Sequence, residues 1–103
     1  MYQLCYVQAI LNKIMLPFTE ERVAEKTFIR IFPEDTPELS LKWHWDEEDR
    51  IIEPVGPTNW LFQFDNQLPT GINNQIFIPK GVIHRVIKGT GELKLKVIKI
   101  NTT

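Results

Sequence analysis

From Thr27 onward, turn residues divide this chain into short apolar runs at regular intervals. β-Branched and aromatic residues dominate each run, and Pro, Gly, Asn or Asp bounds it. The runs, which we expect to be strands, cover residues 27–32, 39–46, 50–55, 59–65, 75–78, 84–88 and 92–100. Strands of this length and spacing predict an all-β fold, either a sandwich or a barrel.

The residues before this region have a less regular pattern. The hydroxyl residue Thr19 is followed by two glutamates and then by apolar residues, which is typical of a helix start. We therefore expect a short helix over residues 19–26. Between residues 1 and 16 the apolar positions fit both helical and strand spacing, so the conformation of that segment stays open.

The length of 103 residues allows one hydrophobic core and leaves too little chain for a second. With 43% hydrophobic and 24% charged residues, the composition is that of a globular protein. We expect a single domain over residues 1–103, in which residues 1–26 form an N-terminal extension and residues 27–100 form the β-barrel.

Charge and cysteine content restrict the classes of partner. The net charge is -1, and no run mixes basic residues with stacking aromatics, which argues against a nucleic-acid partner. The first 16 residues are interrupted by polar side chains and lack a basic leader, so we expect neither a signal peptide nor a membrane span. Cys5 is the only cysteine, which excludes an intramolecular disulfide and favours a cytoplasmic location.

One of the two histidines lies in an expected strand with a carboxylate beside it. His44 and Asp46 are two residues apart, and alternate side chains of a strand share a face, so the two can converge on one ion. Asp49 joins them if the chain turns in between. Trp43 and Trp45 point to the opposite face, which needs a cover from the N-terminal segment or from a second copy of the chain. We expect a homodimer.

The other histidine follows a proline–glycine turn. The sequence from Pro79 to His84 is PKGVIH, in which two apolar residues separate the turn from the histidine. This sequence resembles the second motif of the cupin superfamily, a Pro-x-Gly turn followed after two residues by a metal-binding histidine.

The first cupin motif, a His-x-His pair followed by a glutamate and then a glycine, is matched in part. His44 resembles the first histidine, and Asp46 stands in place of the second. Asp49 resembles the glutamate because Gly56 follows it at the right distance. Two residues, instead of the usual three or four, separate Asp49 from Asp46. The resemblance covers residues 39–100 and implies a single-domain jelly-roll β-barrel of the cupin type.

The resemblance also implies a metal site between the His44 segment and the His84 segment. The candidate ligands are His44, Asp46, Asp49 and His84. Two imidazoles with one or two carboxylates suit a divalent transition metal, Fe, Mn, Ni or Zn, at a site with open positions. No organic cofactor is indicated.

We expect a metal-dependent enzyme that acts on a small polar molecule, with His84 and Asp49 as catalytic residues. Gln63, an amide among large apolar residues, and Arg50, at the rim of the expected site, are the candidate ligand-binding residues. Two alternatives stay open. One is a noncatalytic small-ligand-binding cupin. The other is a metal-free enzyme like the sugar isomerases and epimerases, in which His84 with Asp46 or Asp49 acts as general base.

Overall fold

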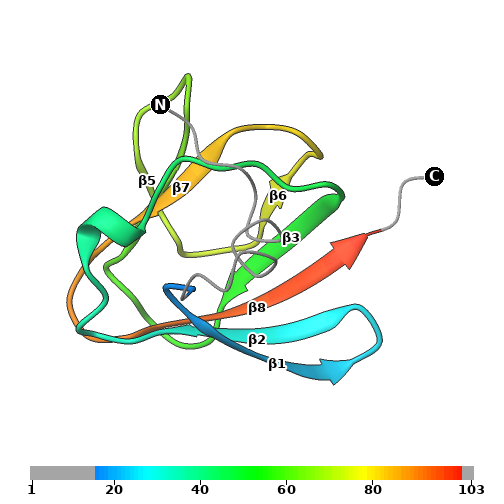
Figure 1. Cartoon of the computed structure of the whole chain (residues 1–103), viewed down its shortest axis with the longest axis horizontal. Coiled ribbons are helices and arrows are strands. Elements are labelled where there is room, and N and C mark those ends of the chain that lie inside the picture. Colours follow the sequence, from blue (N-terminus) through cyan, green and yellow to red (C-terminus); the bar gives the residue numbers. More distant parts are fainter. Residues whose placement is uncertain (1–15, 101–103) are drawn as a thin grey trace.

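The computed structural model describes residues 16–100, which form two antiparallel β-sheets and one short 3₁₀-helix (Figure 1). The strands are β1 (Thr19–Ala24), β2 (Thr27–Phe32), β3 (Asp49–Pro54), β4 (Leu61–Phe64), β5 (Thr70–Gly71), β6 (Ile76–Ile78), β7 (His84–Ile87) and β8 (Leu93–Ile100), and the 3₁₀-helix η1 is Glu38–Ser40. The expectation of an all-β fold is confirmed. No helix within the described range is long and apolar enough to cross a membrane.

The two sheets enclose a common interior. The larger sheet has the strand order β1-β2-β8-β3-β6, and the smaller sheet has the order β5-β4-β7. β8 lies at the centre of the larger sheet, where it pairs with β2 on one side and with β3 on the other. In Figure 1 β1, β2 and β8 of the larger sheet run along the lower right of the molecule, and β5 and β7 lie at the upper left.

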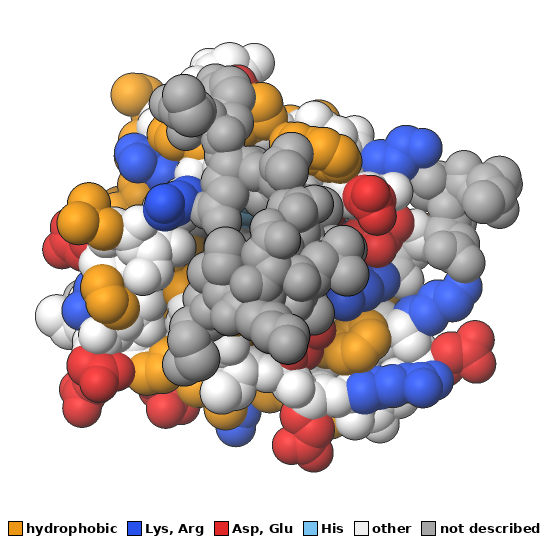
Figure 2. Space-filling model, viewed as in Figure 1, with side chains coloured by type: hydrophobic (Ala, Val, Ile, Leu, Met, Phe, Trp, Pro, Cys, Tyr) orange, Lys and Arg blue, Asp and Glu red, His pale blue; other side chains and the backbone are white. Residues whose placement is uncertain are grey.

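The inner faces of both sheets pack one apolar core. Alternation along β8 shows how it forms, because Leu93, Leu95 and Val97 are buried whereas the lysines between them are half-buried. Trp60 is fully buried, and its indole nitrogen donates to the Gly91 carbonyl at 3.0 Å, so this large side chain enters the core with its polar atom paired. Figure 2 shows acidic and basic side chains interspersed around the outside of one face.

The expected helix over residues 19–26 is wrong. Residues 19–24 form β1, which pairs antiparallel with β2 and turns back through Lys26, whose φ is 60°. The helix-start pattern is a local signal, and it is overridden by a contact with the next strand. Glu20 lies opposite Arg30 and accepts hydrogen bonds from its Nε and Nη2 at 2.9 and 2.6 Å. Part of the expected N-terminal extension therefore belongs to the larger sheet.

The expected strand over residues 39–46 is also wrong in its extent. Residues 38–40 form η1, which begins after Pro37, and within 39–46 only His44 makes a β-bridge. By contrast, β2 has the expected bounds, and β3, β4, β6, β7 and β8 begin and end within two residues of expectation. β5 lies between the expected strands 59–65 and 75–78, where no strand was predicted. The segment whose conformation the sequence leaves open falls on residues 1–15, including Cys5, which lie outside the described range.

We expect Glu20→Gln to lower the free energy of unfolding by about 1 kcal/mol at neutral pH. Burial raises the pKa of Glu20, but the positive charges of Arg30 and Lys99 outweigh burial and hold it below the ordinary value of 4.5. A carboxylate whose pKa is lowered by folding stabilises the fold above its unfolded-state pKa, and that contribution is lost as the pH falls through the folded-state value. The stability difference, measured by urea denaturation, should therefore shrink below pH 4.5.

Glu21→Gln is the matched control, because Glu21 is the exposed neighbour on the same strand. It should change stability by less than about 0.5 kcal/mol. A loss in Glu20→Gln that stays constant from neutral pH to about pH 3 would contradict an electrostatic role for the contact.

Candidate metal centre

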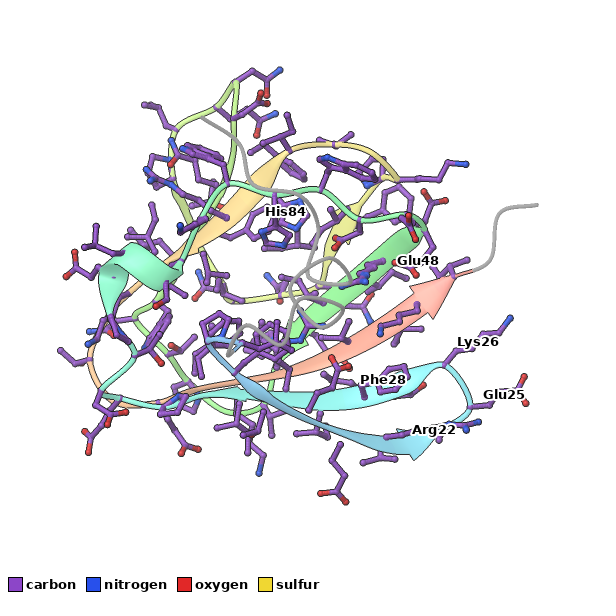
Figure 3. The ribbon with its side chains drawn as sticks, viewed as in Figure 1. Arg22, Glu25, Lys26, Phe28, Glu48 and His84 are labelled. Carbon is purple, nitrogen blue, oxygen red and sulfur yellow. The ribbon has the colours of Figure 1, made fainter. Side chains whose placement is uncertain are left out.

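The two histidines of the chain meet inside the barrel. His44 lies after η1, and His84 is the first residue of β7. Their backbones exchange two hydrogen bonds, from His44 N to His84 O at 3.0 Å and from His84 N to His44 O at 2.9 Å. The ring centroids are 4.4 Å apart, and both residues are buried. Figure 3 shows His84 in the interior between the sheets.

The proline–glycine turn before β7 positions both sides of this site. Gly81 has a φ of +79°, in the left-handed region that favours glycine, and its N–H donates to the Asp46 carbonyl at 2.9 Å. The Val82 N–H closes the turn on the Pro79 carbonyl at 3.2 Å. The turn therefore starts β7 at His84 and also holds the backbone of Asp46.

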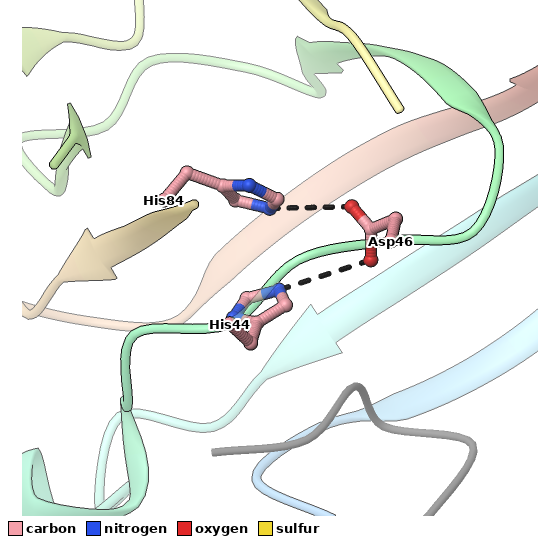
Figure 4. Close-up of side chains that lie close together, drawn as sticks. All are labelled: His44, Asp46 and His84. Atoms are coloured by element: carbon pink, nitrogen blue, oxygen red, sulfur yellow. Dashed lines mark ion pairs between the residues drawn. The ribbon is translucent and has the colours of Figure 1, made fainter. Parts of the chain in front are cut away.

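The Asp46 carboxylate lies between the two imidazoles (Figure 4). Its Oδ2 is 3.3 Å from His84 Nε2, and its Oδ1 is 4.0 Å from His44 Nε2. Arg50 Nη1 approaches Oδ1 at 3.2 Å. The donor atoms of the two histidines and the aspartate all lie within 4.8 Å of one another. The side chains of His44 and Asp46 lie close together, although this segment is not the strand that was expected to bring them to one face.

The other ring nitrogen of each histidine is held by its own backbone. His44 Nδ1 lies 3.1 Å from the Lys42 carbonyl, and His84 Nδ1 lies 2.9 Å from the Val82 carbonyl. Because a carbonyl oxygen only accepts, Nδ1 carries the hydrogen in both rings. In the neutral rings both Nε2 atoms then present lone pairs toward Asp46.

The surroundings of His44 and Asp46 set their charges at neutral pH. Burial, together with the neighbouring His84, lowers the pKa of His44 to about 4, although the charge of Asp46 opposes this shift. Burial raises the pKa of Asp46, but the contact with His84 and the charge of Arg50 outweigh it and lower that pKa to about 2. At neutral pH His44 is therefore neutral and Asp46 is ionised.

A cavity with a volume of about 30 Å³ opens onto these side chains. Its polar lining consists of Arg30, His44, Asp46, Arg50 and His84, and its remaining lining is apolar. A space of this size holds about one ion with one or two water molecules.

The donor set fits a divalent transition metal. Among residues 16–100, Asp46 Oδ2 is the one buried side-chain oxygen or nitrogen without a hydrogen-bond partner. A buried, ionised oxygen of this kind is costly unless a cation or a donor satisfies it. Two imidazoles with one carboxylate form the three-residue face that binds Fe(II) and related ions, and donors about 2.1 Å from one ion lie about 3 to 4 Å apart.

Two residues predicted for the site lie elsewhere. Asp49 is at the start of β3, where its Oδ1 accepts a hydrogen bond from the Lys80 N–H at 2.7 Å, and it is outside the group of three converging donors. Gln63 is in β4, where it accepts from Arg85 and donates to the Gln67 carbonyl, outside the lining of the cavity. Arg50, the other predicted ligand-binding residue, lines the cavity.

Arg30 lines the cavity as well, and the sequence analysis did not select it for the site. The signal that identifies it is the alternation along β2, which places Arg30 on the same face as Phe28 and Phe32. Both phenylalanines belong to the core or pack against it. A basic residue on the apolar face of a strand is buried, and here it is 7% exposed.

Comparisons with known proteins agree on the fold. No family model matches the sequence, and no curated protein matches it. A crystal structure of a cupin domain from Bordetella pertussis Tohama I superposes with a TM-score of 0.54 at 20% identity, covering 82% of this chain and 92% of that one.

Two further crystal structures cover more of the chain. A cupin-2 domain containing protein from Shewanella frigidimarina superposes with a TM-score of 0.58 at 16% identity, covering 92% of each chain. A Neisseria meningitidis protein superposes with a TM-score of 0.56 at 16% identity, covering 91% of this chain and 95% of that one. The chain therefore has the cupin fold, a jelly-roll β-barrel, as the two motifs predict.

We expect Gly81→Ala to lower the free energy of unfolding by about 1 to 2 kcal/mol, because a Cβ disfavours the left-handed backbone at this position. It should also weaken binding of a divalent metal, since the same turn holds Asp46. Gly91→Ala is the matched control, with a φ of +71° in a turn whose carbonyl contacts Trp60. Equal metal affinities in the two variants, measured by titration calorimetry, would contradict the link between turn and site.

Proposed function

We propose that this chain is a metal-dependent enzyme of the cupin fold that acts on a small polar molecule. The proposed ligands are His44 Nε2, His84 Nε2 and one oxygen of Asp46. The observation that supports this most strongly is the convergence of two Nε2 lone pairs on a buried carboxylate whose Oδ2 has no hydrogen-bond partner.

Each protein group has a distinct part in this proposal. The carbonyls of Lys42 and Val82 fix the tautomer and orientation of the two rings, as outer partners of metal ligands commonly do. Arg50 engages Oδ1 of Asp46, which leaves Oδ2 for the ion. A bound Fe, Mn, Ni or Zn ion would polarise a small molecule at its open positions. The apolar part of the cavity wall limits the access of water.

The geometry favours this function over the metal-free isomerase. A general base needs a ring nitrogen that reaches the substrate. In His84, Nδ1 contacts the Val82 carbonyl, and Nε2, the one nitrogen left to act as a base, faces Asp46 Oδ2 at 3.3 Å. A bound cation would satisfy both of these acceptors, whereas a metal-free base would leave Asp46 Oδ2 unsatisfied. A noncatalytic small-ligand-binding cupin that has lost part of the metal set would bind a small molecule without turnover, and the metal analysis below separates it from the proposal.

The remaining expectations from the sequence stay predictions. These are a cytoplasmic location, the absence of nucleic-acid and membrane partners, and a homodimer joined through Trp43 and Trp45. In the structure the two tryptophans are half-buried, and the Arg85 guanidinium lies 4.3 Å from the centre of the Trp43 ring. The catalytic role of Asp49 is also a prediction.

Metal analysis of two aspartate variants tests the proposal. Purified wild-type protein should carry about one equivalent of a transition metal, or bind one of Mn²⁺, Fe²⁺, Ni²⁺ and Zn²⁺ after treatment with a chelator. Asp46→Asn keeps the shape of the side chain but removes its charge, and it should weaken metal binding at least about 100-fold, more than the loss of an outer partner does. Plasma mass spectrometry and titration calorimetry give the two readouts.

Asp49→Asn is the matched control, because an asparagine oxygen still accepts the Lys80 N–H. It should bind metal as wild type does. An equal loss in both variants would favour the wider ligand set that includes Asp49. A wild-type protein that binds none of the four ions would overturn the proposed function, provided that circular dichroism shows it folded.

A further inference from the structure

The outer face of the larger sheet carries apolar side chains at positions that point away from the core. An antiparallel sheet with one face in water normally alternates apolar inner residues with polar outer ones. In β2, β3 and β8, however, Ile29, Ile51 and Ile98 occupy outer positions next to buried inner residues. All three are half-buried, and none is among the described residues that pack against the core. Core packing within residues 16–100 therefore does not explain them.

The strand register places two of these isoleucines in one row with an aromatic residue. Ile98 of β8 is paired with Ile51 of β3, and Ile51 is paired with Phe77 of β6. Residues paired directly across antiparallel strands share a face, so the three side chains lie side by side. Phe77, on the edge strand of the sheet, is 53% exposed. Single apolar residues are normal on a protein surface, but a contiguous row is typical of a surface that binds a protein.

The charged residues beside this apolar row have both signs. In the neighbouring row Lys96 of β8 is paired with Glu53 of β3, and Lys96 Nζ lies 3.3 Å from Glu53 Oε1. Their side chains are 41% and 29% exposed, so both remain accessible to a partner. A face with one sign of charge would favour a partner of the opposite sign, such as a nucleic acid or an anionic membrane. A face with both signs can be complementary to itself.

We propose that the outer face of the larger sheet binds the same face of a second copy of this chain. The two-fold axis of this dimer runs along the strands, between β8 and β3. Rotation about that axis places Ile98 over the partner's Ile51 and Lys96 over the partner's Glu53. Each contact occurs twice, as in any isologous interface, and the apolar side chains fill the space of about 10 Å between the two packed sheets.

The size of this face is sufficient for a specific dimer. The face has five strands, and β1, β2 and β3 are six residues long. Strands about 4.8 Å apart with a rise of about 3.3 Å per residue give about 24 by 20 Å, or about 1,000 Å² over two copies. Specific interfaces begin at about this size. This is not the surface around Trp43, whose ring lies 4.3 Å from the Arg85 guanidinium of the smaller sheet.

Sedimentation equilibrium of the purified chain at micromolar concentration tests the proposed surface. Wild type should have twice the chain mass of 12.1 kDa. Ile51→Lys places a charge at the centre of the interface and should weaken association at least about 100-fold. If that variant does not fold, Phe77→Lys carries the test at an exposed position and should weaken association at least about tenfold. Trp43→Ser is the control and should remain dimeric.

A monomeric wild type, or a folded lysine variant that stays dimeric, would overturn the inference. So would a Trp43→Ser protein that dissociates while the lysine variants do not. None of these measurements needs a bound metal. The dimer and the proposed function can therefore fail separately.

Two charge variants test the position of the two-fold axis. Lys96→Glu and Glu53→Lys each bring like charges together across the interface, so each variant alone should associate at least about tenfold more weakly than wild type. An equimolar mixture of the two should recover the dimer, because every introduced charge then faces an opposite charge in the partner. Contacts within one chain cannot produce this recovery.

Lys42→Glu and Glu47→Lys are the matched control pair. They make the same charge changes at exposed residues outside the larger sheet, and they should associate as wild type does, both separately and mixed. A mixture of the Lys96 and Glu53 variants that associates as weakly as either alone would overturn the proposed interface.

Discussion

Two backbone hydrogen bonds between His44 and His84 hold the candidate site together. His44 belongs to no strand, and it is connected to the smaller sheet by an isolated β-bridge to His84 in β7. The bridge brings the segment after η1 against the first residue of β7, and the Gly81 N–H reinforces it by donating to Asp46. Because the bridge is made by backbone groups, the side chains of both histidines and of Asp46 are left to point into the interior and approach one another.

Local contacts fix the orientations of the His44, His84 and Asp46 side chains. Each imidazole donates its Nδ1–H to the backbone carbonyl two residues earlier, so this local hydrogen bond sets which ring nitrogen faces the interior. Asp46 engages Arg50 through Oδ1, while its Oδ2 has contact but no hydrogen bond. An interior that holds two lone-pair nitrogens and an ionised oxygen is poorly satisfied by protein groups alone. The metal ion that we propose would satisfy this arrangement.

Much of this was predictable from the sequence where the signal is local and periodic. The run of β-branched and aromatic residues from Thr27 to Phe32 predicted β2 with its observed bounds, and the turn before His84 predicted the start of β7. The helix start at Thr19 failed because the contact between Glu20 and Arg30 joins two strands and is invisible in either segment alone. Asp49 matched the cupin pattern in its distance to Gly56, yet it lies at the start of β3 and accepts the Lys80 N–H, and no spacing rule reports that contact.

The central claim is that the convergence of His44, Asp46 and His84 exists to hold a metal ion. Anomalous diffraction from crystals of Mn²⁺-saturated protein tests it most directly. The account predicts one strong anomalous peak bonded to Nε2 of both histidines and to an oxygen of Asp46, with Asp49 still on the Lys80 N–H. Saturated crystals that show no peak among these three residues, or a peak bonded to other side chains, would contradict it.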